Sequence, residues 1–388
     1  MEKKEKRGNS MKKRGLVVGM AILLVAAVLA GCNEGGIESQ SDPKLIDLNR
    51  NNREVAGDDT WATGSDHTYS AHSDKGGNTI QFAFLQDAEA KDQIASSIYY
   101  FENLNDRNIE FRMKKKGATK DDLKAFAADQ CTNFTDGEVG ELINSMDRIQ
   151  AKFDAIGYKY PLTKPFFFAK TTMEEEGGEY LCYARDNCIY VSDAFYDSFD
   201  YADPKDAEIF DYLMTKEVFH ILVNNDITFK ENIDRIFNFQ TCQEPYFSGD
   251  ALDSIYRMPN VGDYDSYAEF MVDGKPVNGI VVPYVPEYSN GDVLLDSMQV
   301  GIVDIEDPSK IIPVEEITNF YLTMGNNTGY VNTIEDCAAD NFAMAVCYQN
   351  EISYSTPDII NAILDYLKTG NETKPVTGKG PEVTIILE

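Results

Sequence analysis

Hydrophobic and polar positions along the chain predict helices in its first and last parts and strands between them. Apolar residues recur with the period of a helix over residues 88–101, 120–128, 138–156, 314–324, 333–349 and 357–367. Short apolar or alternating runs predict strands over residues 165–171, 179–183, 188–192, 267–272, 277–285 and 293–305. Helices on both sides of a strand region indicate one α+β domain with a mixed sheet, not a βαβ repeat.

A long helix is also predicted in the middle of the chain. Asp203 is suited to cap a helix, and Pro204 at the first helical position favours a helix from there to about Val223. Farther on, Asp273-Gly274 is a typical dipeptide for a two-residue hairpin. The central helix therefore lies between two predicted hairpins.

The first 31 residues have the pattern of an export signal. Basic residues precede an uncharged stretch from Gly15 to Gly31, which ends in Leu29-Ala30-Gly31-Cys32. That ending resembles the bacterial lipobox, in which the cysteine thiol is acylated. We expect a signal peptide over residues 1–31, a lipid on Cys32 and an outward-facing lipoprotein on a bacterial cell membrane. A plain transmembrane anchor is the less favoured alternative, because a span needs ~20 apolar residues.

The mature chain divides into a tether, a domain and a tail. Residues 32–78 are polar, with no sustained apolar period, which is typical of a flexible tether. The domain is predicted over residues 79–370, with a C-terminal tail over 371–388. His67 and His72 fall in the tether, where a solvated linker is favoured over a metal site.

The charge of the chain limits its partners. Lys and Arg total 35 against 65 Asp and Glu, so the formal net charge is -30. Such a surface repels a phosphate backbone, which makes nucleic acid a poor partner.

Six cysteines follow Cys32: Cys131, Cys182, Cys188, Cys242, Cys337 and Cys347. An even number in an exported chain permits up to three disulfides, whose pairing the sequence does not define. Cys182 and Cys188 flank a predicted hairpin turn and are the best candidates for a pair. Cys337 and Cys347 fall ten residues apart on one predicted helix, beyond the reach of a disulfide.

The central helix carries the residues of greatest chemical interest. It contains Lys216-Glu217-Val218-Phe219-His220. A zinc peptidase with an HExxH helix uses two histidines four residues apart as ligands and the intervening glutamate as general base. Glu217 and His220 occupy their positions here, but Lys216 stands where the first histidine belongs. Chance placement on an ordinary amphipathic helix is the alternative interpretation.

A second motif follows at the expected distance. Thr333 is a suitable N-cap for the next helix, on which Asp336 and Asp340 share one face. In a gluzincin, such a second helix supplies the third zinc ligand, and an acidic residue one turn later supports a ligand histidine.

Together the two motifs resemble those of bacterial exported zinc metallopeptidases of the gluzincin type. That pattern has an H-E-x-F-H helix and a later N-T-x-Y followed by P-E-E-x-x-A-D-N-F, and the resemblance spans about residues 188–347. This chain matches it at Glu217, Phe219, His220, Asn327, Thr328, Tyr330, Glu335, Ala339, Asp340, Asn341 and Phe342. It departs at Lys216, Ile334 and Asp336, where the family has His, Pro and Glu.

The resemblance implies a zincin-like domain with Glu217 as catalytic base and with His220 and Asp336 as metal ligands. Lys216 and Asp340 would lie in the shell around them. An ammonium has no free lone pair for zinc, and two remaining ligands fall short of the usual three. We therefore expect a degenerate site in which Lys216 forms a salt bridge with Asp340, with Asp336 or with both.

Three functions remain open at this point. The favoured one is a tethered lipoprotein that binds a peptide or protein ligand in the former substrate cleft, or acts as a scaffold. The second is a working zinc metallopeptidase with an unrecognised ligand, and the third is a solute- or glycan-binding lipoprotein.

Overall fold

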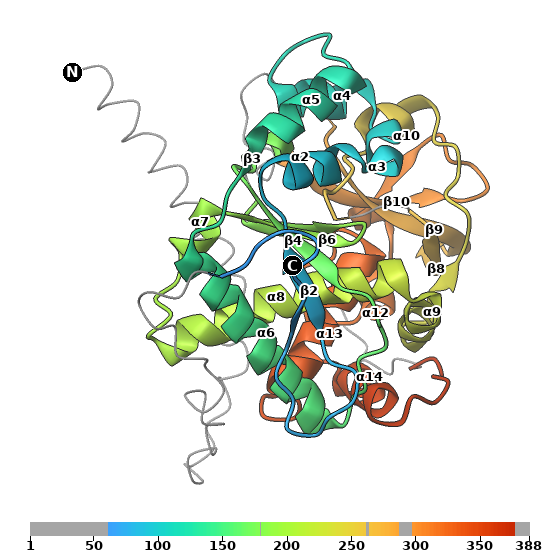
Figure 1. The fold of residues 1–388 in the computed structure, drawn as a ribbon. Helices are drawn as coiled ribbons and strands as arrows, with labels where there is room; N and C mark the ends of the chain where they lie inside the picture. Colours follow the sequence, from blue (N-terminus) through green and yellow to red (C-terminus); the bar gives the residue numbers. More distant parts are fainter. Residues whose placement is uncertain (1–60, 179, 261–263, 287–296, 377–388) are drawn as a thin grey trace.

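Two β-sheets lie among the helices of this computed structural model, which describes residues 61–178, 180–260, 264–286 and 297–376 (Figure 1). The first sheet contains β1 (Tyr69–Ser70), β2 (Gln81–Phe84), β3 (Cys131–Thr132), β4 (Phe166–Thr171), β5 (Cys182–Arg185) and β6 (Cys188–Ser192). The second contains β7 (Gln240–Thr241), β8 (Ser266–Val272), β9 (Lys275–Tyr284), β10 (Gln299–Asp304) and β11 (Ile311–Pro313).

The first sheet is mixed, as the sequence predicts. Its strand order is β1-β2-β4-β6-β5, with β3 paired to the end of β4. Strands β2, β4 and β6 run parallel, whereas β1, β3 and β5 pair antiparallel to their neighbours. The α+β class with a mixed sheet is therefore confirmed.

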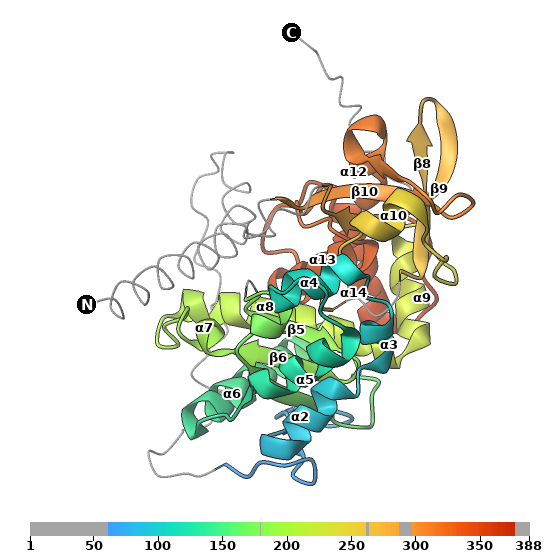
Figure 2. The same ribbon diagram turned by 90° about the horizontal axis from the view of Figure 1, so that it is seen from above.

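The second sheet is antiparallel, in the order β11-β10-β9-β8-β7. Its central hairpin turns at Asp273 and Gly274, whose φ angles are 49° and 73°. Two consecutive positive φ angles are the requirement of a type I′ turn, which suits this dipeptide. The β8–β9 hairpin projects on the same side of the molecule as α10 and α12 (Figure 2).

The helices cover both faces of the first sheet. Their bounds are α2 (Asp87–Ala95), α3 (Ile98–Glu102), α4 (Asp106–Met113), α5 (Lys120–Gln130), α6 (Asp136–Ile156), α7 (Asp193–Tyr196), α8 (Pro204–Asn225), α9 (Ile227–Ile236), α10 (Gly249–Ser254), α12 (Phe320–Met324), α13 (Ile334–Tyr348) and α14 (Pro357–Thr369). The described residues also include the 3₁₀ turns η2 (Glu174–Glu176) and η3 (Val314–Glu316).

Alternate residues along the strands of the first sheet point to opposite faces and pack in two different hydrophobic cores. Phe166 and Phe168 of β4 pack in the core with α6, α8, α13 and α14, whereas Ala169 packs in the core with α2 to α5. This follows from the period of two in a strand. In Figure 1 the helices α2 to α5 lie above the sheet, and α6, α8, α13 and α14 lie below it.

The central helix forms where the sequence predicts it. The Asp203 side chain accepts a hydrogen bond from the backbone N–H of Lys205, Pro204 is the first helical residue, and α8 ends at Asn225. Its buried face packs against α13 and α6. Side chains of α8 therefore lie against α13.

Two predicted helices are broken, and the first, over residues 88–101, forms α2 and α3 with Ser96 and Ser97 between them. Residues 314–324 form η3 and the short helix α12 with an irregular segment between them. In that segment Ile317 bridges to Val272, and the backbone N–H of Thr318 donates to the carbonyl of Met271. These bonds to the edge of β8 replace the hydrogen bonds of a continuous helix. The hydrophobic period of residues 314–324 cannot reveal such a contact with a distant strand.

Residues 61–78, predicted as tether, are part of the packed structure. Strand β1 pairs with β2, Ala71 is buried, and the Ser73 hydroxyl donates to Asp154 of α6. At the other end, the backbone N–H of Val376 donates to the carbonyl of Ile236. The packed structure therefore extends beyond the predicted boundaries at residues 79 and 370. Residues 1–60, with Cys32, and 377–388 lie outside the described residues.

The predicted disulfide between Cys182 and Cys188 is wrong, because both are free thiols. In the β5–β6 register, Cys182 lies opposite Val191 and Cys188 lies opposite Arg185. Cys182 packs toward the core that contains α8, whereas Cys188 packs in the core with α2 to α5. The two thiols lie on opposite faces of the sheet, so no turn geometry can join them.

Candidate functional site

Helices α8 and α13 pack against each other and bring the two sequence motifs together. Helix α8 supplies Lys216, Glu217 and His220, and α13 supplies Asp336 and Asp340. The start of α13 is held by its N-cap, since the Thr333 side chain accepts from the backbone N–H of Asp336. This cap places the motif carboxylates on the first turns of the helix, beside α8.

Lys216 forms the ion pair that the sequence predicts. Its Nζ lies 3.0 Å from Oδ1 of Asp340, and the side chains are only 13% and 7% exposed. The ammonium also lies 3.9 Å from the centroid of the Tyr330 ring, which is cation–π geometry. Burial lowers the pKa of Lys216, but the charges of Asp340 and Asp336 and the hydrogen bond to Asp340 together outweigh it, so the net pKa shift is upward. The lysine is therefore charged.

Asp340 has two further donors that hold it in place. The Tyr212 hydroxyl donates to Oδ1 over 2.7 Å, and the Thr328 hydroxyl donates to Oδ2. Tyr212 comes from α8 one turn before Lys216, and Thr328 comes from the loop that precedes α13. The carboxylate is thus fixed toward the position of Lys216, where a gluzincin would hold its first histidine.

His220 has a partner on each ring nitrogen. Its Nδ1 lies 2.6 Å from Oε1 of Glu335, and its Nε2 lies 2.9 Å from Nδ2 of Asn260. Nε2 is also 3.9 Å from Oδ1 of Asp336. Burial lowers the pKa of this histidine, but the hydrogen bond to Glu335 and the charges of Glu335, Glu217 and Asp336 together outweigh it, and the net pKa shift is upward.

Glu217 and Asp336 each keep one carboxylate oxygen without a partner among the described residues. Oε1 of Glu217 lies 3.5 Å from the Cys182 thiol, and Oδ1 of Asp336 accepts from Nδ2 of Asn260 over 2.9 Å. Oε2 of Glu217 and Oδ2 of Asp336 are buried and unpaired within the described part of the chain. Burial raises the pKa of both carboxyl groups. The carboxyl groups of Glu217 and Asp336 therefore give up their protons less readily than exposed carboxyl groups do.

Asn260 permits two arrangements of these protons. With neutral His220, its amide N–H groups donate to Nε2 and to Asp336, as in the structure. Its Oδ1 has no partner among the described residues. Turning the amide would point Oδ1 at a protonated His220 and a protonated Asp336, both of which could donate to it. His220 and Asp336 can thus each hold a proton if only the oxygen and nitrogen of the Asn260 amide exchange places.

The donor set does not fit zinc. Lys216 offers an ammonium bound to Asp340 instead of a lone pair, and Asn260 occupies Nε2 of His220. Across the described ranges, no group of three or more His, Cys, Asp and Glu residues is arranged to hold a metal. His72 does not supply the missing ligand, because its Nε2 lies 3.1 Å from Asp74 on the exposed segment near β1.

Sequence reasoning brought together Lys216, Glu217, His220, Asp336 and Asp340, and the structure places all of them at the α8–α13 contact. It missed two partners, Asn260 and Cys182. Asn260 lies in a loop after α10 with no periodic signal, and Cys182 had been assigned to a disulfide. Glu335 matched the family pattern, but its bond to His220 required the fold.

Comparisons with protein-family models, with curated proteins and with solved structures found no match for this chain. Among the described helices, none combines the length and apolar character needed to cross a membrane.

Proposed function

We propose that this protein is an outward-facing bacterial lipoprotein whose zincin-like domain has lost its zinc site and now binds a peptide or protein ligand. The observation that carries the proposal is the buried ion pair between Lys216 and Asp340. An ammonium at this position supplies one positive charge among the carboxylates that would otherwise surround a dication. It keeps the two helices together but provides no Lewis acid.

The chemistry of the remaining groups supports loss of hydrolysis. In a zinc peptidase, the glutamate acts on a water whose pKa is lowered by the metal. Glu217 is buried, its pKa is raised, and its Oε1 faces a thiol. Without a metal-bound water, a carboxyl group in this environment has no activated nucleophile to deprotonate.

Hydrolysis is the function to test first. The wild-type protein with added zinc is expected to cleave a library of unstructured peptides no faster than its Glu217→Gln variant. Mass spectrometry of the peptide mixture over time measures both. Zinc-dependent cleavage that Glu217→Gln abolishes would establish the working metallopeptidase instead.

Membrane attachment rests on Cys32 in Leu29-Ala30-Gly31-Cys32. The Cys32→Ser variant is expected to leave the membrane fraction or to remain as unprocessed precursor, because the acyl chain has no thiol to join. Fractionation with metabolic lipid labelling measures this, and Cys131→Ser is the control that keeps its label. Unchanged processing, with no label on the wild type, would exclude a lipoprotein.

A further inference from the structure

Asn260 places a primary amide against the buried centre of the α8–α13 site. Its Nδ2 lies 2.9 Å from Nε2 of His220 and 2.9 Å from Oδ1 of Asp336. His220 and Asp336 are fully buried, whereas Asn260 is half-buried. Asn260 is therefore the member of this hydrogen-bonded cluster that solvent or a ligand can reach.

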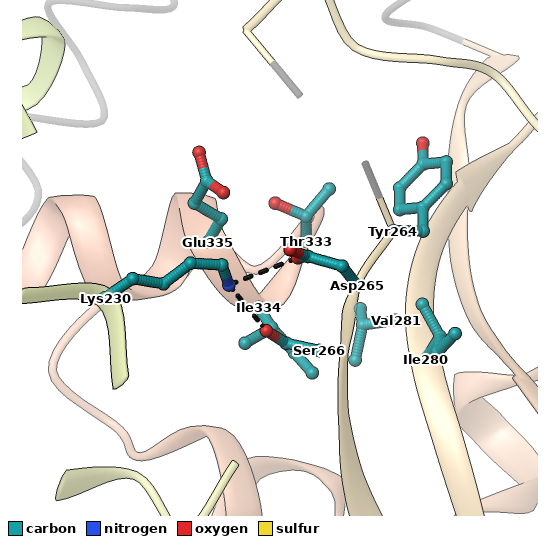
Figure 3. A pocket seen from close by; sticks show the side chains of 9 residues that line it. All are labelled: Lys230, Tyr264, Asp265, Ser266, Ile280, Val281, Thr333, Ile334 and Glu335. Atoms are coloured by element: carbon teal, nitrogen blue, oxygen red, sulfur yellow. Dashed lines mark hydrogen bonds and ion pairs between the residues drawn. The ribbon is translucent and has the colours of Figure 1, made fainter. Parts of the chain in front are cut away.

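The hydrogen bonds of His220 define which group fits at this position. In Figure 3, Glu335 extends from the first turn of α13, and its Oε1 lies 2.6 Å from Nδ1 of His220. Because Nδ1 donates to this carboxylate, neutral His220 keeps Nε2 as an acceptor. Oδ1 of Asp336 is the second acceptor. Two acceptors at 2.9 Å from one nitrogen require an NH₂ group, which has a hydrogen for each of them.

The centre also has hydrogen-bonding capacity that Asn260 does not use. Oδ2 of Asp336 and Oδ1 of Asn260 itself are buried and have no partner within the described part of the chain. A buried polar atom without a partner lowers the stability of the arrangement that contains it. Asn260 therefore satisfies the centre only in part, and a ligand with further donors can pair with the oxygen of Asp336 that Asn260 leaves.

The backbone before Asn260 is held from the other side of the first sheet. The Pro259 carbonyl accepts from Nε of Arg185 over 3.0 Å, and Glu176 pairs with the same guanidinium. Both charged side chains are buried. These bonds fix the main chain next to Asn260, whereas the amide can leave the centre by rotation about the bonds of its own side chain. Displacement of the amide thus requires no movement of the backbone.

We propose that this centre binds a primary carboxamide, as carried by an asparagine or glutamine side chain of a peptide, and that Asn260 occupies it from within the chain until such a ligand displaces it. The inference rests on the proposed function, because it names the chemistry of the peptide ligand. Asn260 is then an internal competitor, whose own occupancy lowers the apparent affinity of the site for a ligand.

The Asn260→Gly variant tests the proposal, because the group that it removes has the heavy atoms of acetamide. The chain has three histidines, so the imidazole nitrogens of His220 can be followed by NMR of the full-length mature protein in detergent, with His67→Gln and His72→Gln for assignment. Acetamide at about 100 mM is expected to shift the His220 signals of the variant. In wild type the same shift is expected to require at least about tenfold more acetamide, because Asn260 competes.

Related small molecules identify the group that binds. N-methylacetamide has a single N–H and is expected to bind Asn260→Gly about tenfold more weakly than acetamide, because one hydrogen bond is lost. N,N-dimethylacetamide and acetate have no N–H and are expected to leave the His220 signals unchanged. Equal affinity for acetamide and N-methylacetamide would assign the site to a peptide bond and overturn the assignment to a primary carboxamide.

Asn187→Gly is the matched control. Nδ2 of Asn187 also donates a hydrogen bond, to the Pro165 carbonyl over 3.0 Å, but this residue lies in the turn between β5 and β6. Its variant is expected to respond to acetamide as wild type does. Circular dichroism checks folding, and Asn260→Ala replaces a glycine variant that does not fold. If neither variant folds, wild type decides, since ~1 M acetamide must then shift the His220 signals.

The proposal is overturned if acetamide leaves the His220 signals of the folded variant unchanged, or if it binds wild type and Asn260→Gly equally. Such a failure leaves the proposed function standing, because the hydrolysis test with Glu217→Gln does not involve Asn260. Zinc-dependent cleavage would instead remove the proposed function, while the acetamide titration could still succeed.

Discussion

Replacing Lys216 with methionine is expected to lower the free energy of unfolding by about 3 kcal/mol, because it leaves a buried carboxylate without its counter-charge. Asp340 is 7% exposed, and its remaining partners are the hydroxyls of Tyr212 and Thr328. The substitution also removes the cation over the Tyr330 ring. Urea unfolding followed by circular dichroism measures the change.

An exposed ion pair of the same length is the matched control. Nζ of Lys114 lies 3.0 Å from Glu174, but these side chains are 63% and 40% exposed. Lys114→Met is expected to cost less than ~1 kcal/mol. The double change Lys216→Met with Asp340→Asn should recover part of the loss, since it removes the stranded charge. The account is contradicted if Lys216→Met costs no more than Lys114→Met.

Restoring the ligand set should restore metal binding. The double variant Lys216→His with Asp336→Glu is expected to bind zinc at least about 100-fold more tightly than either single variant, because ligands in one shell act together. His220 would be the second imidazole, and Asp340 is already held where it could orient the introduced one. Competition with a chromophoric chelator measures zinc affinity.

Two controls accompany this titration. The single variants show whether each ligand alone contributes, and the double variant with His220→Gln added should lose the gain. If the double variant binds zinc no better than the singles, the two helices do not hold the arrangement of a zinc site. The family resemblance over α8 would then be a coincidence of sequence.

Much of the fold could be predicted from local signals. Strand β6 and the N-terminus of α8 agree with the expected residues, because an apolar run and an Asp-Pro cap are encoded locally. The break at Ile317 and the packing of residues 61–78 could not be predicted. Both depend on hydrogen bonds to distant segments, β8 and α6.

The candidate site could likewise be predicted only in part from the sequence. Spacing on two helices was enough to predict that Lys216 would meet Asp340, since each helix face follows from its period. Asn260 was missed because it enters from a loop after α10. The Cys182 prediction was wrong because a short separation in sequence does not reveal that two thiols lie on opposite sheet faces.

The amount of zinc bound to the wild-type protein tests most directly whether Lys216 has taken the place of the metal. Full-length protein is purified from membranes without chelators, dialysed against a slight excess of zinc and analysed by atomic absorption. The double variant Lys216→His with Asp336→Glu is carried through the same steps. We predict well under one zinc per chain for wild type and about one for the double variant. Near-stoichiometric zinc on wild type would contradict the account.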